Sequence, residues 1–261
     1  INLLHKIMKI DCSHQHILVT GGTRGIGAAI TRTLVECGAT VIAHYNRNEE
    51  SAQKLKKELG SSIHLIKADL SGAMEVARLF SETLEYFDGR LDGIVNNAGI
   101  ALSSDINKNA IEWTDDWLKT MDVNVNAVGL LCKRSVVQFQ KQENGGRIVN
   151  ISSRAAFRGD TADYLAYATS KGAVVSLTKS LARAFGKQNI KAFTVAPGFV
   201  RTDMAQQFID QYGEGFALDD IALTKLTEPE DVSPTIAMLM SGLMDHATGT
   251  TIDINAGSYV H

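Results

Sequence analysis

The sequence predicts an α/β fold in which helices cover both faces of one doubly wound parallel sheet. Short runs of apolar, β-prone residues alternate with longer helical patterns along the whole chain of 261 residues. The strand runs are almost continuously apolar, which is typical of strands that are buried on both faces of a sheet. Repeated strand–helix–strand units with right-handed crossovers place such strands in parallel.

The predicted elements follow one another in order. The first strand is recognised from His-Ile-Leu-Val-Thr at 16–20 and the second from Thr-Val-Ile-Ala-His at 40–44. All the predicted strands lie near 16–20, 40–44, 63–67, 92–96, 147–151, 190–196 and 250–254. The predicted helices lie near 25–37, 48–59, 72–88, 114–140, 164–186 and 229–241. This alternation is the pattern of β–α–β units.

The chain is expected to form a single domain over residues 15–261, after an N-terminal extension at residues 1–14. A chain of this length can bury a sheet that is covered on both faces. No linker, repeat or low-complexity segment interrupts it, and its three prolines all lie after residue 190. The sequence leaves open whether Met8 is the natural start, in which case residues 1–7 would be a vector-derived addition.

The composition narrows the classes of partner. The formal net charge is −3 and the pI is near 6.2, so no basic surface for nucleic acid or anionic membrane is expected. No apolar run is long enough to span a membrane, and the first residues lack the features of a signal peptide. We therefore expect a cytoplasmic protein that acts on a small molecule.

Neither a disulfide framework nor a metal site is expected. The three cysteines, Cys12, Cys37 and Cys132, are scattered and odd in number, a usage that suits a reducing cytosol. His14 and His16 lie near Cys12, but they lead into the first predicted strand. We interpret them as structural residues.

A glycine-rich turn follows the first strand. It reads Gly21-Gly22-Thr23-Arg24-Gly25-Ile26-Gly27. Such glycines let a strand turn sharply into a helix, whose N-terminal amides then face a phosphate group. The spacing alone also suits a purely structural turn. A nucleoside-triphosphate loop is not supported, because the turn lacks the required Lys-Ser/Thr ending. The favoured ligand is a dinucleotide.

The end of the second strand indicates which dinucleotide is bound. NAD-binding proteins usually place an acidic residue there for the ribose 2′-hydroxyl, whereas NADP-binding proteins need arginine for the 2′-phosphate. This chain has Asn46 and Arg47 and no acidic residue before Glu49. Arg24 in the glycine turn is a second cation. Either arginine alone would equally suit a solvated surface, but together they favour NADP(H) over NAD(H).

Polar or small residues follow four further strands. Asp69 and Leu70 follow the third strand, the run 96–99 (Asn-Asn-Ala-Gly) the fourth, Ser153 the fifth, and Pro197-Gly198 the sixth. In doubly wound sheets, ligands bind outside the carboxyl ends of the strands. These residues are therefore expected to lie with the glycine turn around one binding cleft.

Tyr167 and Lys171 are the candidate chemical centre. Four residues apart on a helix, they share one face, although a solvated helix surface would give the same spacing. A nearby ammonium lowers the pKa of a phenol, so Tyr167 could exchange a proton with a carbonyl oxygen. Ser153 would hydrogen-bond the same oxygen, with Ser152 as an adjacent alternative. Tyr164 has no cation at this spacing and is the weaker candidate.

With these motifs in this order, the chain resembles the short-chain dehydrogenase/reductase family. The resemblance runs from about Gln15 to about Gly257. The spacing from Ser153 to Tyr167 is longer by one residue than in many relatives, and Ala256 replaces a common glycine. The motifs are Thr20-Gly21-xxx-Gly25-Ile26-Gly27, Asp69-Leu70, Asn96-Asn97-Ala98-Gly99, Asn124, Ser153, Tyr167-xxx-Lys171 and Pro197-Gly198-Phe199-Val200-Arg201-Thr202.

The resemblance implies a Rossmann-type fold and a catalytic tetrad. Tyr167 would be the acid/base, and Lys171 would lower its pKa and bind the cofactor ribose. Ser153 would position the carbonyl, and Asn124 would hold a proton-relay water.

The same resemblance implies where the cofactor lies. Asp69 would meet the adenine, Asn96 would lie near the cofactor ribose, and Val200 and Thr202 would lie near the nicotinamide carboxamide. The other cofactor contacts expected along this edge are Leu70, Asn97, Ala98, Gly99, Pro197 and Gly198.

These residues predict an NADPH-dependent carbonyl reductase, reversibly an alcohol dehydrogenase, similar to 3-oxoacyl-carrier-protein reductases. A dehydrogenase of a sugar, a steroid-like compound or another secondary alcohol is the alternative within the family. A dinucleotide-binding sensor without catalysis is the alternative from another class. The intact Tyr, Lys, Ser and Asn set argues against the sensor, because a sensor does not need a tuned phenol.

The substrate lid is expected at 203–225. Its apolar residues predict an apolar substrate pocket. Its acidic residues would repel a highly acidic carrier protein and so disfavour its binding. Arg154 and Arg158 beside the serine could offset that repulsion, so acyl carrier protein stays a weak candidate partner. The apolar residues are Met204, Phe208, Ile209, Tyr212, Phe216 and Leu218, and the acidic residues are Asp203, Asp210, Glu214, Asp219 and Asp220.

The helices at 114–140 and 164–186 are expected to mediate assembly. Relatives pack the corresponding helices into a four-helix bundle between subunits, and the second helix here carries apolar residues suited to that packing. A homotetramer or a homodimer is therefore expected, with the tetramer favoured.

Overall fold

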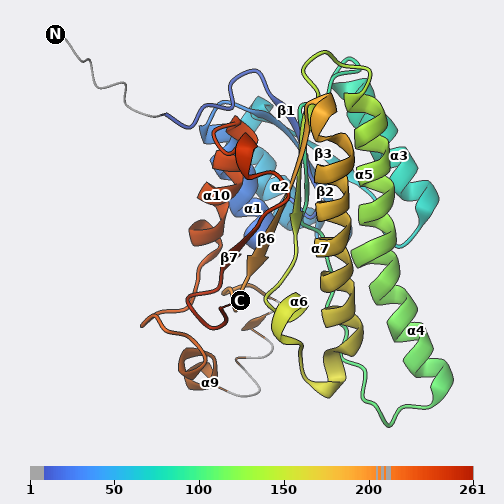
Figure 1. The fold of residues 1–261 in the computed structure, drawn as a ribbon, viewed down its shortest axis with the longest axis vertical. Coiled ribbons are helices and arrows are strands. Elements are labelled where there is room, and N and C mark those ends of the chain that lie inside the picture. Colours follow the sequence, from blue (N-terminus) through green and yellow to red (C-terminus); the bar gives the residue numbers. More distant parts are fainter. Residues whose placement is uncertain (1–8, 204, 207–208, 210–212, 261) are drawn as a thin grey trace.

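The computed structural model describes residues 9–203, 205–206, 209 and 213–260. In this part of the chain, seven parallel strands form one sheet in the order β3-β2-β1-β4-β5-β6-β7 (Figure 1). The predicted doubly wound α/β fold is confirmed. The strands are β1 (His16–Val19), β2 (Thr40–Tyr45), β3 (Ile63–Lys67), β4 (Gly93–Asn96), β5 (Gly146–Ile151), β6 (Ile190–Pro197) and β7 (Thr251–Ile254).

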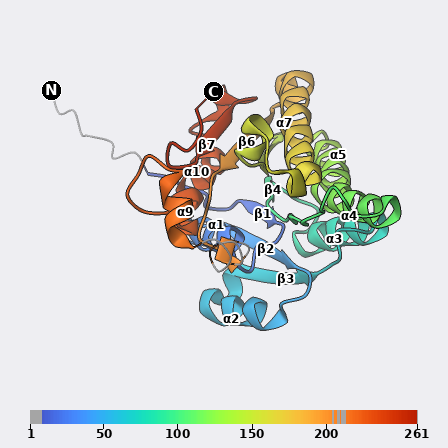
Figure 2. The ribbon, with the colours of Figure 1, turned by 90° about the horizontal axis from the view of Figure 1, so that it is seen from below.

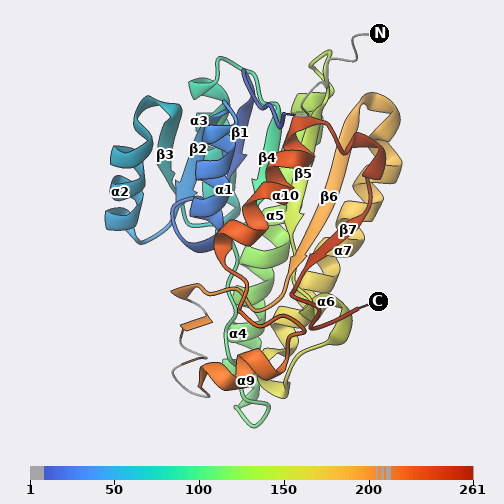
Figure 3. The same ribbon diagram turned by 90° about the vertical axis from the view of Figure 1, so that its left-hand side faces the viewer.

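Helices cover both faces of this sheet. α1 and α10 pack together on one face, and α3, α5 and α7 cover the other, as Figures 2 and 3 show. Each face buries its own apolar cluster, since successive strand residues such as Ile17 and Leu18 point to opposite sides. The helices are α1 (Gly25–Glu36), α2 (Glu49–Leu59), α3 (Ala73–Tyr86), α4 (Ala110–Met121), α5 (Ala127–Phe139), α6 (Ala155–Arg158), α7 (Leu165–Phe185), α9 (Glu214–Asp219) and α10 (Pro229–Ser241).

The largest difference from the predicted elements lies in the helix expected at 114–140. It begins earlier, as α4, because the side chain of Asn109 caps it by accepting two backbone N–H groups, at 3.0 and 3.1 Å. A π-helical turn at Asp122–Asn126 then separates α4 from α5. The short helices α6 and α9 were also not predicted. α6 has only one turn, and its sequence carries no helical periodicity of its own.

Glycine is required where β1 turns into α1. Gly21 and Gly25 have positive φ angles of 60° and 50°, which other residues rarely adopt. A Cβ on Gly27 would lie 1.9 Å from the carbonyl oxygen of Gly21, a distance no side chain tolerates. The backbone of the turn therefore lies directly against the first turn of α1.

His44, at the end of β2, ties this turn to the sheet. Its Nδ1 accepts a hydrogen bond from the backbone N–H of Gly21 at 3.0 Å. The ring proton must then lie on Nε2, which donates to the carbonyl of Ala68 at 3.0 Å. The ring is buried, and burial lowers the pKa of His44 to about 4, against weaker opposing effects of Ala68 and Asp69. The imidazole is therefore neutral at physiological pH.

We predict that acid weakens the fold through His44. Its pKa is lower in the folded chain than in the unfolded chain, so its contribution to stability is complete above about pH 6.5 and is lost as the pH falls towards 4. The full loss is roughly 3 kcal/mol of unfolding free energy. His44→Asn should reduce the pH dependence of urea unfolding between pH 6.5 and 4.

The exposed His246 provides the control. His246→Asn should leave that pH dependence unchanged. Superimposable pH dependences for wild type and His44→Asn would show that His44 does not couple folding to protons.

Candidate active site

The candidate site lies at the carboxyl edge of the sheet, where β1 and β4 are held together beyond their last paired residues. Thr20 Oγ1 accepts hydrogen bonds from the backbone N–H groups of Asn97 and Ala98, both at 3.0 Å. The side-chain amide of Asn97 donates to the carbonyls of Thr20 and Gly21, at 2.9 and 3.1 Å. Asn97 therefore holds the glycine turn in place, with its amide N–H groups engaged by the protein.

The glycine turn forms a candidate phosphate cradle at the N-terminus of α1. A Cβ on Gly21 would lie 3.1 Å from Cα of Ala98, and a Cβ on Gly25 would lie 3.2 Å from Cγ2 of Thr202, so the turn packs closely against these neighbours. A helix N-terminus attracts anions. Thr23 is buried and Ile26 is half-buried in the same segment. These residues fit the pyrophosphate of a dinucleotide.

The two arginines expected at the 2′-phosphate lie on the surface near this cradle. Arg47 and Asn46 are both exposed. The charge of Arg47 acts on the carboxylate of Asp69. Hydrogen bonds from Ser71, and more weakly the charge of Arg47, hold the pKa of Asp69 below its usual value. Arg24 Nη1 lies 3.5 Å from Asp203 Oδ2, and both side chains are largely exposed. A contact this long and this exposed holds Arg24 only weakly.

The side chain of Asn96 is held within the protein. It is buried and donates to Asn150 Oδ1 at 2.7 Å and to Cys132 Sγ at 3.4 Å. The expected position of Asn96 near the cofactor ribose therefore stays a prediction that concerns its backbone. Strand residues alternate between faces, and this one points under α5 and α7 and not out of the carboxyl edge.

The remaining expected cofactor contacts lie along the same edge and offer mainly backbone. Leu70, Pro197 and Val200 are buried. Gly198 donates its N–H to Ile254 O at 2.9 Å, and a Cβ there would lie 2.7 Å from Cα of Asn255. The edge is therefore smooth and closely packed, which suits contact with an extended ligand.

Ser153, and not Ser152, faces Tyr167. Ser152 donates its hydroxyl to the backbone carbonyl of Lys171 at 2.9 Å, so it is committed to holding α7. Ser153 is hydrogen-bonded to the Tyr167 side chain and also accepts the N–H of Ala155 at 3.1 Å. The two hydroxyls that the predicted chemistry needs are therefore in contact.

Lys171 lies beneath the Tyr167 ring. Its Nζ is 5.7 Å from the ring centroid and donates to the carbonyl of Ile151 at 3.0 Å. The side chain is only 5% exposed, and burial lowers the pKa of Lys171 to about 8. The pair therefore shares a helix face, as the sequence predicted.

Asn124 joins this group through the π-helical turn. Its Nδ2 donates to the Ile100 carbonyl at 2.8 Å and to Ser170 Oγ at 3.0 Å, and its Oδ1 accepts the N–H of Ile100 at 2.9 Å. A Cβ on Gly99 would lie 3.3 Å from both Asn124 Oδ1 and Lys171 Nζ. Asn124 and Lys171 thus meet at Gly99, directly after β4.

One electrostatic expectation is wrong in this structure. The sequence predicted that Lys171 lowers the pKa of Tyr167, but burial raises it. The hydrogen bond from Ser153 and the charge of Arg154 oppose that rise, and Asp160 adds to it. The desolvation of the phenolate outweighs the attraction of nearby cations. Tyr167 is therefore a neutral proton donor at physiological pH.

Sequence reasoning missed the role of His44 and the contacts of Arg154. Arg154 follows Ser153 and pairs with Asp220 in the expected lid, at 2.6 Å. Of the other lid residues, Met204, Phe208, Asp210 and Tyr212 lie outside the described residues. Among the residues that are described, no cluster of three or more His, Cys, Asp or Glu side chains could hold a metal ion.

Comparisons with known proteins place this geometry in a family. A family profile described as "Enoyl-(Acyl carrier protein) reductase" matches residues 21–259. The 3-oxoacyl-[acyl-carrier-protein] reductase of Aquifex aeolicus is 32% identical over 255 residues, which are 97% of this chain and 100% of that protein. The 3beta-hydroxysteroid dehydrogenase 1 of Eggerthella lenta is 32% identical over 251 residues, 95% of this chain and 94% of that protein.

A solved structure agrees with these sequence matches. The short chain dehydrogenase of Burkholderia cenocepacia in complex with NADP superposes with a TM-score of 0.85 at 32% identity, covering 94% of this chain and 98% of that one. The described residues include no helix that is long and apolar enough to cross a membrane. With the seven-stranded parallel sheet and the matches to nearly full length, the chain belongs to the short-chain dehydrogenase/reductase family, whose oxidoreductases bind a nicotinamide dinucleotide and act on alcohol and carbonyl groups.

Proposed function

We propose that this protein reduces a carbonyl to a secondary alcohol, reversibly, with NADPH as its preferred cofactor. The observation that carries the proposal is the contact of Ser153 with Tyr167, above a buried Lys171, beside a glycine cradle. A neutral phenol at the end of a hydrogen bond to a serine is a suitable general acid for a carbonyl oxygen.

The residues act in defined roles. Bound NADPH supplies the hydride. Tyr167 donates its phenolic proton to the carbonyl oxygen, while the Ser153 hydroxyl hydrogen-bonds the same oxygen and stabilises its developing charge. The raised pKa of Tyr167 keeps that proton in place at neutral pH. Lys171 binds the cofactor ribose, and Asn124 holds a water that returns a proton.

The residues along the edge described above would hold the cofactor. The amides of the glycine turn would bind its pyrophosphate, Asn46 and Arg47 its adenosine ribose, and Asp69 its adenine. Thr202 would contact its nicotinamide. The remaining contacts would be made by Gly21, Thr23, Arg24, Gly25, Ile26, Gly27, Leu70, Asn97, Ala98, Gly99, Pro197, Gly198 and Val200.

Two substrate classes remain within this proposal. A relative that reduces 3-oxoacyl thioesters and a relative that oxidises hydroxysteroids match this chain at the same 32% identity. Acyl carrier protein is the weaker partner, because the acidic residues of the lid sequence would repel a highly acidic protein. A sensor without catalysis is disfavoured by the intact catalytic group. We also propose that this protein is cytoplasmic. The proposal is consistent with the three unpaired cysteines among the described residues.

We predict that Tyr167→Phe abolishes reduction and keeps NADPH binding. The ring retains its packing but loses its transferable proton, and general acid catalysis contributes about 10²- to 10⁴-fold. The measurement is NADPH oxidation across ketones and acyl thioesters, with NADPH binding followed by fluorescence. Tyr164→Phe, three residues earlier, should keep the wild-type rate. A Tyr167→Phe rate above about a tenth of wild type would exclude this role.

We predict at least about a tenfold preference for NADPH over NADH in kcat/KM. One effective hydrogen bond to a charged group contributes about 1.5–3 kcal/mol before exposure weakens it, and about 1.4 kcal/mol is tenfold. Arg47→Ala should lose most of this preference while kcat/KM with NADH stays unchanged. Equal use of NADH and NADPH by the wild-type enzyme would assign both arginines to the solvated surface.

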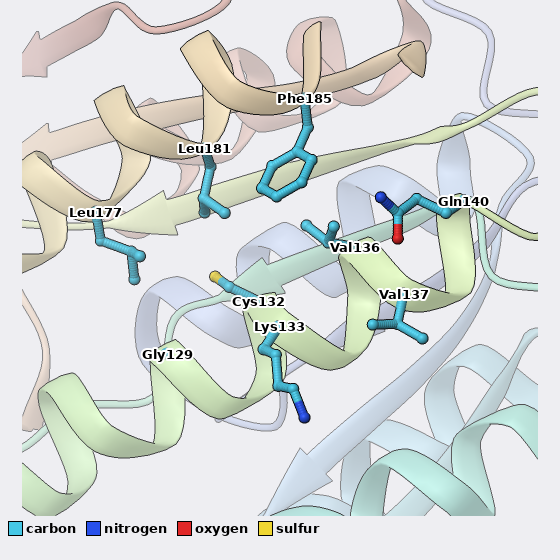
Figure 4. Close-up of a pocket in the computed structure, with 9 residues that line it drawn as sticks. All are labelled: Gly129, Cys132, Lys133, Val136, Val137, Gln140, Leu177, Leu181 and Phe185. Carbon is cyan, nitrogen blue, oxygen red and sulfur yellow. The ribbon is translucent and has the colours of Figure 1, made fainter.

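We also propose that α5 and α7 form a subunit interface, in a homotetramer or a homodimer. A shallow apolar groove runs between the two helices, with Val136, Leu181 and Phe185 lining it (Figure 4). Val137, beside them, is 44% exposed. An apolar groove of this kind on two long parallel helices suits packing against its own copy.

Val137→Glu should therefore dissociate the assembly. A carboxylate loses its hydration when an apolar interface buries it, and Lys133, one turn earlier in the same groove, would offset that penalty only in part. Multi-angle light scattering at micromolar concentration should give a tetramer for wild type and a smaller species for the variant. Met74→Glu, at an exposed apolar residue of α3, should keep the wild-type mass. A monomeric wild type would rule out this interface.

A further inference from the structure

Two arginines lie immediately beyond the candidate catalytic serine. Arg154 follows Ser153, and Arg158 ends the single turn of α6, so their side chains leave the backbone on the same side. Arg154 is unusually covered for an arginine, with 14% of its side chain exposed, and Arg158 is 36% exposed. The charge of Arg154 also acts against the rise in the pKa of Tyr167.

Both arginines converge on one carboxylate from a distant segment. Asp220 Oδ2 lies 2.6 Å from Arg154 Nη1, and Arg158 Nη1 lies 3.2 and 3.0 Å from Asp220 Oδ1 and Oδ2. Asp220 directly follows α9, and α6 and α9 both lie beyond the carboxyl edge of the sheet (Figure 3). A carboxylate can therefore occupy the space between the arginines, within reach of the catalytic group.

The cluster formed by Arg154, Arg158 and Asp220 contains two positive charges and one negative charge in direct contact. Burial, and then repulsion from Arg158, lowers the pKa of Arg154, although Asp220 opposes both effects. Asp160 is the other carboxylate that acts on Arg154, but it accepts the N–H of Thr161 at 2.8 Å. Within the described ranges, neither arginine forms an ion pair with Asp160. A cation this covered is stable only with an anion beside it.

We propose that Arg154 and Arg158 form a recognition site for a carboxylate on the substrate, and that Asp220 occupies this site when no such substrate is bound. The inference rests on the proposed function and narrows its substrates to oxo acids, which are reduced to hydroxy acids. Guanidinium groups suit this role because their N–H groups match the two oxygens of a carboxylate. Bound NADPH provides the hydride, Tyr167 the proton, and the substrate carboxylate remains unchanged.

The Asp220 contact has a simpler reading, in which it only fastens the segment carrying α9 to α6. The two readings predict opposite effects of Asp220→Asn. If Asp220 competes with a substrate carboxylate, Asp220→Asn raises kcat/KM for the acids and leaves kcat/KM for the esters unchanged. If Asp220 is only a fastening, its neutralisation weakens the reduction of acids and esters alike.

The test uses 2-, 3- and 4-oxopentanoate, each beside its methyl ester. The three acids are isomers whose carbonyl lies at different distances from the carboxylate, and each is compared with its own ester, which removes the charge without removing the carbonyl. Wild type should prefer at least one acid over its ester about tenfold or more in kcat/KM. A hydrogen bond to a charged group contributes enough binding free energy for about a tenfold effect. Asp220→Asn should raise this ratio, and Arg158→Gln should bring it towards one.

Arg90→Gln is the matched control, because Arg90 pairs with Asp92 at 2.9 Å at the opposite edge of the sheet. It should keep the wild-type ratio. A ratio near one in wild type, or an equal fall for acids and esters in Asp220→Asn, would overturn the carboxylate site alone. Failure to reduce any of the six compounds or any ketone would overturn the proposed function, and this inference with it.

Discussion

The parallel pairing of β1, β4 and β5 is the constraint on which the candidate site depends. Val19 pairs with Val95 and Val95 pairs with Val149, so the carboxyl ends of the three strands lie within two residues of one another, with β4 and β5 reaching slightly further than β1. The glycine turn, Gly99 and Ser153 follow those ends. Because the side chains of a strand alternate, a slip of one residue in either pairing would turn these residues away from the edge. Beyond the last paired residues, the backbone N–H groups of Asn97 and Ala98 donate to Thr20 Oγ1 and hold the segment after β4 against the segment after β1.

The centre of the site is built from buried polar groups that the backbone satisfies. Ser152 donates to the carbonyl of Lys171, and Lys171 donates to the carbonyl of Ile151, so α7 is fastened to β5 from both sides. Asn124 does the same between the π-helical turn and Ile100. Groups held in this way need no rearrangement when charge develops on a substrate, which is how preorganised sites accelerate reactions. The low exposure of Lys171 makes its charge effective over a longer range.

The fold and most of the site were predictable because their signals are local. Apolar runs located every strand, and the residues after each strand located the edge. The break at Asp122–Asn126 was not predictable, because no proline or glycine marks it. The burial of Asn96 was not predictable either. Adjacent residues of a strand point to opposite faces of the sheet, and the sequence Asn96-Asn97 does not show which of the two asparagines is buried. The pKa of Tyr167 depends on how much water the folded chain excludes, which a sequence pattern does not report. Long-range contacts such as that of Arg154 with Asp220 arise only from the tertiary fold.

The central claim is that this edge binds a nicotinamide dinucleotide with its reactive ring beside Tyr167. A crystal structure of the chain with NADPH tests it most directly. The account predicts phosphate oxygens on the amides of the glycine turn, and the nicotinamide between Tyr167 and Thr202, with the Tyr167 hydroxyl open to a carbonyl oxygen. A dinucleotide bound away from the glycine turn, or a nicotinamide ring that does not lie beside Tyr167, would contradict it.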